Sequence, residues 1–151
     1  MGESIKRILV VDDEENTRIG LSKLLSQEGF EVESAANGND ALDLLSQHKI
    51  NLVISDINMP DMNGLELLKM VKKQWPLTKA VMMTAYASTD TAVKAIRLGA
   101  LDYLSKDQLI GILEDNISAG LFRRFENDMP FDERTRENVL ELVDGLYLIN
   151  Q

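Results

Sequence analysis

Carboxylates are concentrated at two points of this sequence, each at the end of a run of apolar residues. Asp12 and Asp13 follow the run Ile8 to Val11, with two more acids directly behind them, and Asp56 ends the stretch "LVISD". Carboxylates held close together repel one another, and a hard divalent cation such as Mg²⁺ offsets that repulsion while keeping several waters of its own. The sequence therefore predicts a magnesium site if the fold brings the two points together.

The two acids that come next, Glu14 and Glu15, fall at the predicted start of a helix. At that end of a helix the dipole and the free backbone amides favour negative charge. We therefore expect the helix to offset part of the repulsion from these two side chains.

Two further polar residues, Thr84 and Lys106, also stand at the ends of short apolar runs. A threonine hydroxyl can donate one hydrogen bond to an anionic oxygen, and a lysine ammonium is a compact charge on a flexible stem. Taken singly, each residue has an ordinary explanation. An aspartate after a strand is often a turn former or a helix cap, and a lone threonine or lysine is more often a packing or solvated residue. Their shared position favours a common site.

Short β-branched runs alternate along the chain with segments in which apolar residues recur every three or four positions. The runs predict five strands, at "RILVV", "VESA", "NLVIS", "KAVMMT" and "DYLS", and the segments between them predict helices. Near-continuous apolar strands joined by helices favour a parallel sheet covered on both faces, which is a three-layer α/β fold. Ligands of such sheets bind beyond the carboxyl ends of the strands. The predicted fold therefore brings Asp12, Asp13, Asp56, Thr84 and Lys106 to one edge.

The regular alternation ends with a fifth predicted helix, which carries an apolar stripe from Leu109 to Leu121 and runs to about Phe125. The polar break "ENDMP" follows, and the last residues predict one more short amphipathic helix with Asp132 as its N-cap. Its apolar residues are enough to pack on the same domain, on a second copy or on another domain. We expect this tail to mediate docking or the formation of a homodimer.

The composition excludes several classes of function. The chain has 151 residues, no cysteine and a net charge of -9, so it fits one domain with a modest extension and has no thiol nucleophile, disulfide or thiolate metal site. The excess of acids opposes binding to nucleic acid, and we expect no direct DNA contact by this chain. No apolar run is long enough for a membrane span and the N-terminus lacks a signal peptide, so we expect a soluble, cytoplasmic protein.

Four stretches resemble the receiver domain of two-component response regulators in order and spacing, namely "VVDDEEN", "LVISDINMPDMNGLELL", "AVMMTAYA" and "GALDYLSK". The resemblance covers Arg7 to about Phe125 and is greatest to receivers of AAA+ transcriptional activators of the nitrogen-regulation type. It implies a flavodoxin-like, doubly wound, five-stranded parallel sheet of order 2-1-3-4-5 with five helices. It also implies a receiver domain over residues 5–126, followed at 127–151 by a helical extension or the start of a missing output segment.

By this resemblance Asp56 is the phosphoacceptor, and Mg²⁺ is held by Asp12, Asp13, Asp56 and the backbone carbonyl of Asn58. A carboxylate can attack phosphorus in line to form an acyl phosphate when nearby positive charge offsets the repulsion between the two anions. The implied protein is a signalling phosphoacceptor. It is no enzyme beyond taking a phosphoryl group from a donor and losing it again by hydrolysis.

The resemblance also assigns Thr84 and Lys106 to the phosphoryl oxygens and makes Tyr103 an aromatic switch, whose ring moves inward when the Thr84 loop moves. Phosphorylation then alters a surface of the protein. The implied donor is a sensor histidine kinase or a phosphotransfer protein, and the implied target is a downstream protein or a missing output domain. The lifetime of the acyl phosphate depends on flanking residues, including Asn58 and Tyr86, in a direction that the sequence leaves open.

One residue departs from the family pattern. Receivers usually have proline after the lysine, often with a cis bond between them, whereas Asp107 follows Lys106 here. A cis bond before a residue other than proline costs roughly 2.5–4 kcal/mol. We therefore expect a trans bond, which could displace the Lys106 ammonium from Asp56, and a role for Asp107 in capping the fifth helix.

This departure keeps a second hypothesis open, a pseudo-receiver that acts as an interaction module without phosphate. Two other classes fit the residues less well. A phosphohydrolase of the haloacid dehalogenase type needs a second aspartate two residues after the nucleophile, where this chain has Asn58. A flavodoxin is disfavoured because the acidic loop after the first strand would repel a flavin phosphate.

Overall fold

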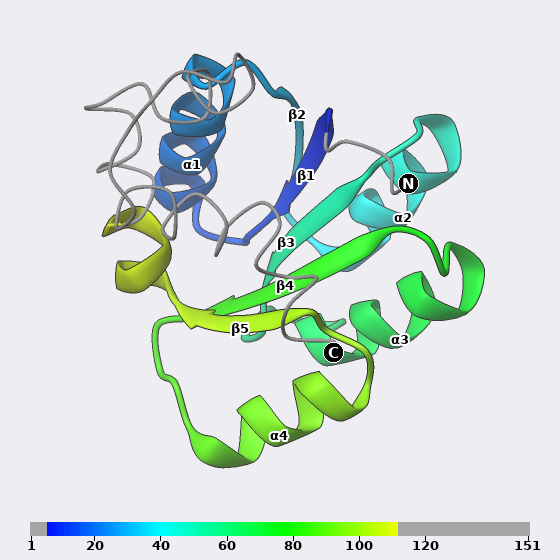
Figure 1. Ribbon diagram of the computed structural model, residues 1–151, viewed down its shortest axis with the longest axis vertical. Helices are drawn as coiled ribbons and strands as arrows, with labels where there is room; N and C mark the ends of the chain where they lie inside the picture. The colour runs from blue at the N-terminus through cyan, green and yellow to red at the C-terminus, as the bar shows by residue number, and fades with distance from the viewer. Residues whose placement is uncertain (1–5, 112–151) are drawn as a thin grey trace, which may run out of the picture.

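The computed structural model describes residues 6–111 of the chain. Figure 1 shows a twisted central sheet with helices on both of its faces. The strands are β1 (Arg7–Val11), β2 (Glu31–Ala35), β3 (Leu52–Asp56), β4 (Lys79–Thr84) and β5 (Asp102–Ser105), and the helices are α1 (Glu15–Gln27), α2 (Gly38–Gln47), α3 (Gly64–Gln74) and α4 (Thr89–Arg97). Residues 106–111 are also helical. Within 6–111, no helix has the length and apolar character of a membrane-spanning segment.

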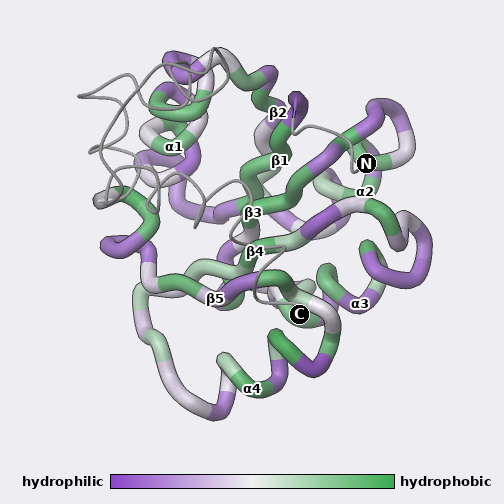
Figure 2. The backbone as a smooth tube through the Cα atoms, viewed as in Figure 1, coloured by the Kyte–Doolittle hydropathy of each residue, from purple (hydrophilic) through white to green (hydrophobic). Residues whose placement is uncertain are grey.

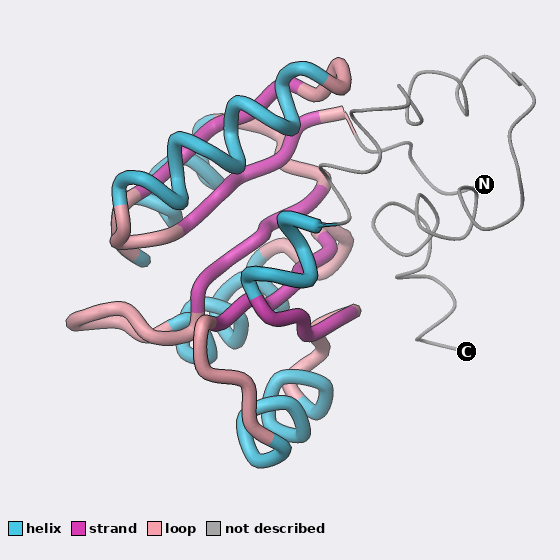
Figure 3. Tube along the Cα trace, turned by 90° about the vertical axis from the view of Figure 1, so that its left-hand side faces the viewer, coloured by secondary structure: helices cyan, strands magenta, loops and turns pink. Residues whose placement is uncertain are grey.

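All strand pairs are parallel, and the order across the sheet is β2-β1-β3-β4-β5. The predicted fold and strand order are therefore confirmed. Leu21, Leu25 and Leu109 share a core with β1 and β3, so α1 and the helical residues 106–111 cover one face. The helices α2, α3 and α4 cover the other face (Figure 3). The inner strands β1 and β3 are nearly all buried, and Figure 2 shows that they are largely hydrophobic.

Side-chain caps fix the points at which three of the helices begin. Asn37, Asn63 and Ser88 are the N-caps of α2, α3 and α4, and each side chain accepts a hydrogen bond from a backbone amide in the first turn. Such caps satisfy backbone donors that have no partner within the helix. The N-cap of α1 is Glu14, whose side chain makes no capping hydrogen bond. Its carboxylate is therefore free for another contact.

The helix after β5 begins with a reciprocal cap. Ser105 Oγ accepts a hydrogen bond from the Gln108 amide at 3.0 Å, and Gln108 Oε1 accepts one from the Ser105 amide at 3.0 Å. This arrangement is a capping box, which satisfies two backbone donors at once. The prediction that Asp107 caps the helix is therefore wrong, because Asp107 lies inside the first turn. The rest of the predicted fifth helix and the tail helix at Asp132 lie outside the described residues.

The start of α3 lies so close to the end of β3 that only glycine fits there. The Gly64 amide donates a hydrogen bond to the Ile57 carbonyl at 2.8 Å. A Cβ atom at position 64 would lie 2.1 Å from the Asp56 carbonyl oxygen and 2.8 Å from Ile57 Cα, which are both backbone atoms. This close approach fixes the loop that follows Asp56.

We predict that Gly64→Ala destabilises the protein by about 1–3 kcal/mol, the usual cost of an overpacked position, because the backbone cannot move aside without displacing Asp56. Gly20→Ala, inside α1, is the matched control. Nothing lies within 4 Å of a Cβ atom there, and alanine should stabilise the helix by roughly 0.5–1 kcal/mol. Urea unfolding of the three proteins measures both effects. Equal stability of Gly64→Ala and the wild type would show that the loop is free to move.

Candidate functional site

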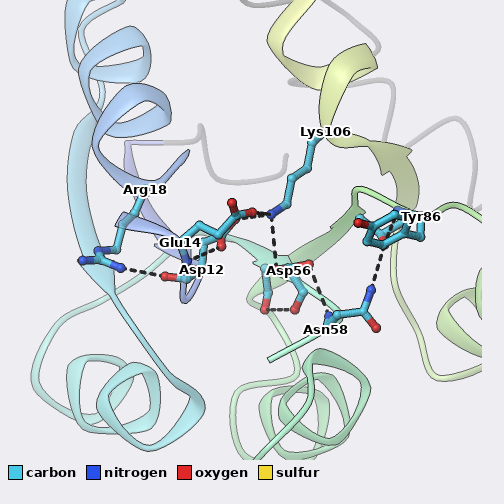
Figure 4. A network of polar contacts seen from close by, with 9 residues as sticks. Asp12, Glu14, Arg18, Asp56, Asn58, Tyr86 and Lys106 are labelled. Carbon is cyan, nitrogen blue, oxygen red and sulfur yellow. Dashed lines mark hydrogen bonds and ion pairs between the residues drawn. The ribbon is translucent and has the colours of Figure 1, made fainter. Parts of the chain in front are cut away.

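The carboxyl ends of four strands meet at one edge of the sheet, and the predicted site residues lie there together. Asp12 directly follows β1, Asp56 and Thr84 are the last residues of β3 and β4, and Lys106 directly follows β5. At most 8% of the surface of any of these four is exposed, whereas Asp13 is exposed. Figure 4 shows Asp12, Asp56 and Lys106 pointing toward one another. The structure brings together all five residues that the sequence pattern singled out.

Asp12, Asp13 and Asp56 form an acidic cluster, in which one carboxylate oxygen of each lies within 4.8 Å of the others. Asp12 Oδ1 accepts a hydrogen bond from the Glu14 amide at 2.8 Å, and the buried Asp12 Oδ2 lies 2.9 Å from the Lys106 ammonium. Carboxylates this close together repel one another, and a cation bound among the three would offset that repulsion. The acidic cluster therefore fits a small divalent cation that prefers oxygen ligands.

The Lys106 ammonium lies among three carboxylates. Its Nζ is 2.8 Å from Glu14 Oε1, 2.9 Å from Asp12 Oδ2 and 3.3 Å from Asp56 Oδ2. Residues 6–111 contain no cis peptide bond, so the bond between Lys106 and Asp107 is trans, as predicted. The expected displacement of the ammonium does not occur, because the side chain reaches from the first helical turn to Asp56 (Figure 4).

These contacts shift the protonation equilibria of the site. Burial raises the pKa of Asp56, and the charge of Asp12 raises it further against the opposing charge of Lys106. Burial lowers the pKa of Lys106, but its hydrogen bonds to Glu14 and Asp12 and the charges of Asp12 and Asp56 outweigh burial, so the pKa is raised overall. The hydrogen bond and charge of Lys106 in turn lower the pKa of Glu14. Lys106 is therefore held as an ammonium, while the charge of Asp56 is only partly offset.

The Thr84 hydroxyl accepts two hydrogen bonds, from Asn58 Nδ2 at 3.2 Å and from the Tyr86 amide at 3.1 Å. Asn58 also donates from its backbone amide to Asp56 Oδ1 at 3.2 Å, so it connects the ends of β3 and β4. A hydroxyl that accepts these bonds still has its own hydrogen to donate. Thr84 is therefore able to donate a hydrogen bond to an anion bound beside Asp56.

The Tyr103 hydroxyl lies at the start of α4. It accepts a hydrogen bond from the Ser88 amide at 3.1 Å and shares a short one of 2.5 Å with the Thr91 hydroxyl. Because Ser88 is the N-cap of α4, these bonds connect β5 to the first turn of that helix. The switch role of Tyr103 concerns a movement of its ring and stays a prediction.

Two contacts of the site lie beyond the sequence prediction. The sequence places Glu14 at the favourable end of a helix dipole, yet its carboxylate pairs with Lys106, 92 residues further along the chain. Arg18 Nη1 donates a hydrogen bond to the Asp12 carbonyl oxygen at 2.8 Å and so ties the loop after β1 to α1. No local pattern points to either contact, because both depend on how this loop packs.

A family model described as "Response regulator receiver domain" matches residues 8–117. This chain belongs to that family. The receiver is 45% identical over 103 residues to the regulatory protein AtoC of Escherichia coli (strain K12), a match that covers 68% of this chain and 22% of AtoC. It is 37% identical over 143 residues to the DNA-binding transcriptional regulator NtrC of Proteus hauseri, which covers 92% of this chain and 29% of NtrC. The chain spans less than a third of the length of these two relatives.

Solved structures similar to this receiver have the same fold. The chemotaxis protein CheY4 of Vibrio cholerae matches with a TM-score of 0.67 at 29% identity, over 93% of this chain and 99% of that one. A response regulator protein of Burkholderia pseudomallei, solved with a phosphorylated aspartic acid, a calcium ion and citrate, matches with a TM-score of 0.65 at 30% identity, over 76% of this chain and 69% of that one. The resemblance to receivers of transcriptional regulators is thus confirmed for the fold and the family.

We predict that, without divalent cations, Asp56→Asn raises the free energy of unfolding at pH 7. Burial raises the pKa of Asp56, so the folded protein binds this proton more tightly than the unfolded chain does. The carboxyl group therefore contributes stability below its unfolded pKa and loses that contribution as the pH rises through the raised folded pKa. The difference in the free energy of unfolding between Asp56→Asn and the wild type should shrink as the pH is lowered toward the ordinary pKa of aspartate. Urea unfolding at a series of pH values measures it.

Asp43→Asn is the control for this experiment, because it removes the same charge from an exposed position of α2. We expect it to change stability little at any of these pH values. A wild type more stable than Asp56→Asn at pH 7 would mean that the attraction of Lys106 exceeds the effects of burial and of Asp12.

Proposed function

We propose that this receiver accepts a phosphoryl group on Asp56 from a sensor histidine kinase or a phosphotransfer protein. The position of Asp56 carries the proposal, because its carboxylate ends a fully buried strand and lies 3.3 Å from the Lys106 ammonium. A preorganised positive charge at that place offsets the repulsion between the carboxylate and an incoming phosphoryl group. The Burkholderia pseudomallei structure with its phosphorylated aspartic acid supports this chemistry for the fold.

In the proposed reaction a carboxylate oxygen of Asp56 attacks the phosphorus in line with the leaving atom of the donor. An O–P bond forms at Asp56 while the bond from phosphorus to the imidazole nitrogen of the donor breaks, and the electron pair leaves with that nitrogen. Lys106 exchanges one carboxylate partner for a phosphoryl oxygen, and Thr84 donates its free hydroxyl hydrogen to another. The product is an acyl phosphate.

We assign Asp12, Asp13 and Asp56, together with the backbone carbonyl of Asn58, as the groups that hold Mg²⁺. The acidic cluster supports this assignment, because its three carboxylates offer oxygen ligands within 4.8 Å of one another. When bound, the ion supplies positive charge beside the carboxylates and the phosphoryl oxygens. Phosphorylation should therefore depend on Mg²⁺ in solution.

We further propose that Tyr103 transmits the state of Asp56 to the surface. Asn58 holds the Thr84 hydroxyl in the structure, and a new hydrogen bond from Thr84 to a phosphoryl oxygen would draw the loop after β4 toward Asp56. That loop carries Ser88, whose amide donates to the Tyr103 hydroxyl. Its movement therefore shifts the ring and changes the surface formed by α4 and β5.

The signal is proposed to reach a transcriptional output, in a downstream protein or in a domain beyond the receiver. AtoC is named a regulatory protein and NtrC a DNA-binding transcriptional regulator, and this chain corresponds to less than a third of each. We assign the receiver to residues 5–126, and residues 127–151 to a segment that docks on a partner, dimerises or begins an output domain. We place the protein in the cytoplasm and expect the DNA contacts to come from the output.

The proposal predicts that wild-type protein gains the mass of one phosphoryl group on incubation with acetyl phosphate and Mg²⁺, as measured by intact-mass analysis. The gain should be absent without Mg²⁺ and absent in Asp56→Asn, because the amide lacks the nucleophilic carboxylate. Asp43→Asn, on the exposed side of α2, should gain the group like the wild type.

A folded wild type that gains no mass from acetyl phosphate or from phosphoramidate would contradict the proposal. It would favour a pseudo-receiver that binds its partner without phosphate. The structure gives that alternative no further support, since the trans bond at Asp107 leaves the Lys106 ammonium beside Asp56.

A further inference from the structure

Glu14 differs from the other two carboxylates that contact Lys106. Its side chain is 63% exposed, whereas those of Asp12 and Asp56 are 0% and 5% exposed. It nevertheless makes the shortest of the three contacts, at 2.8 Å. Neither the proposed metal site nor the proposed phosphorylation of Asp56 assigns a role to Glu14.

The backbone on both sides of Glu14 is fixed, so its position is well defined. Its amide donates to Asp12 Oδ1 at 2.8 Å, and its carbonyl oxygen accepts from the Arg18 amide at 3.0 Å. Its side chain makes no capping bond to α1. Figure 4 shows the carboxylate directed across the loop toward Lys106.

An ammonium has three N–H donors, and Lys106 faces three carboxylates. To bind a phosphoryl oxygen, it must give up one of these partners. Leaving Asp12 or Asp56 would leave a buried charge without its counter-charge, which is costly. Glu14 is largely exposed, so water can replace the ammonium there at small cost.

We propose that Glu14 is a positioning residue that holds the Lys106 ammonium toward the outer side of the site and gives it up when a phosphoryl group arrives. Two effects follow. First, an ammonium that is held by Glu14 competes less with a metal ion for Asp12 and Asp56 than it would without Glu14. Its release opposes the step in which it binds a phosphoryl oxygen, so Glu14 slows phosphorylation. The second effect rests on the proposed phosphoacceptor function, and the first does not.

The test compares Glu14→Gln with Glu15→Gln. Glu15 is the exposed next residue, in the first turn of α1, and its loss removes the same charge near the same loop without touching Lys106. Isothermal titration calorimetry measures the affinity for Mg²⁺, and intact-mass analysis at saturating Mg²⁺ measures the rate of phosphorylation by acetyl phosphate.

We expect Glu14→Gln to weaken Mg²⁺ binding more than Glu15→Gln does, by a further factor of roughly two to five, the range of a partly exposed ion pair. We expect it to speed phosphorylation by a similar factor, whereas Glu15→Gln should change the rate much less. On a Lys106→Met background, Glu14→Gln and Glu15→Gln should weaken Mg²⁺ binding equally, because the difference between them acts through the ammonium.

Equal effects of the two substitutions on Mg²⁺ affinity would overturn the proposal, because Glu14 would then act only through net charge. A difference that persists without Lys106 would also overturn it, because Glu14 would then act on the metal site independently of the ammonium. An unchanged rate beside a shifted Mg²⁺ affinity would overturn the effect on phosphorylation alone. A wild type that takes no phosphoryl group while the Mg²⁺ difference is present would support the positioning role and contradict the proposed function.

Discussion

One ammonium among three carboxylates is the interaction on which the site depends. The register of the sheet places Val11 of β1 opposite Ser55 of β3, so Asp12 and Asp56, the next residues of each, emerge side by side. Burial of the inner strands fixes this register, and the repulsion between the two aspartates is therefore imposed by the core. Lys106 offsets part of that repulsion. The repulsion that remains favours the binding of a cation at this edge of the sheet.

The strand pattern could be predicted from the sequence wherever burial is complete. β1, β4 and β5 have the predicted bounds, whereas β2 begins one residue earlier, at the exposed Glu31 of an edge strand. β3 is shifted by one residue, so that it ends at Asp56 and leaves out Asn51, whose side chain accepts hydrogen bonds from the Lys6 and Arg7 amides. An apolar pattern identifies the buried residues of a strand, and polar contacts at the ends set its limits.

The site could be predicted in its composition but not in its contacts. Residues at the carboxyl ends of parallel strands must meet, and that rule is enough to bring Asp12, Asp56 and Lys106 together. The contact of Glu14 with Lys106 depends on the direction of an exposed side chain after packing, which no local pattern determines. The start of the last helix is different, because the spacing of Ser105 and Gln108 is that of a capping box and was readable from the sequence.

The capping box also explains why the residue that replaces proline leaves the site intact. It starts the helix at Lys106, whose side chain then reaches Asp56 across the edge of the sheet. A crystal structure of the protein with Mg²⁺ and beryllofluoride, a mimic of the phosphoryl group, tests this account most directly. We expect the Lys106 ammonium to lie within hydrogen-bond distance of a fluoride bound at Asp56. An ammonium turned away from that fluoride, toward solvent, would contradict the account.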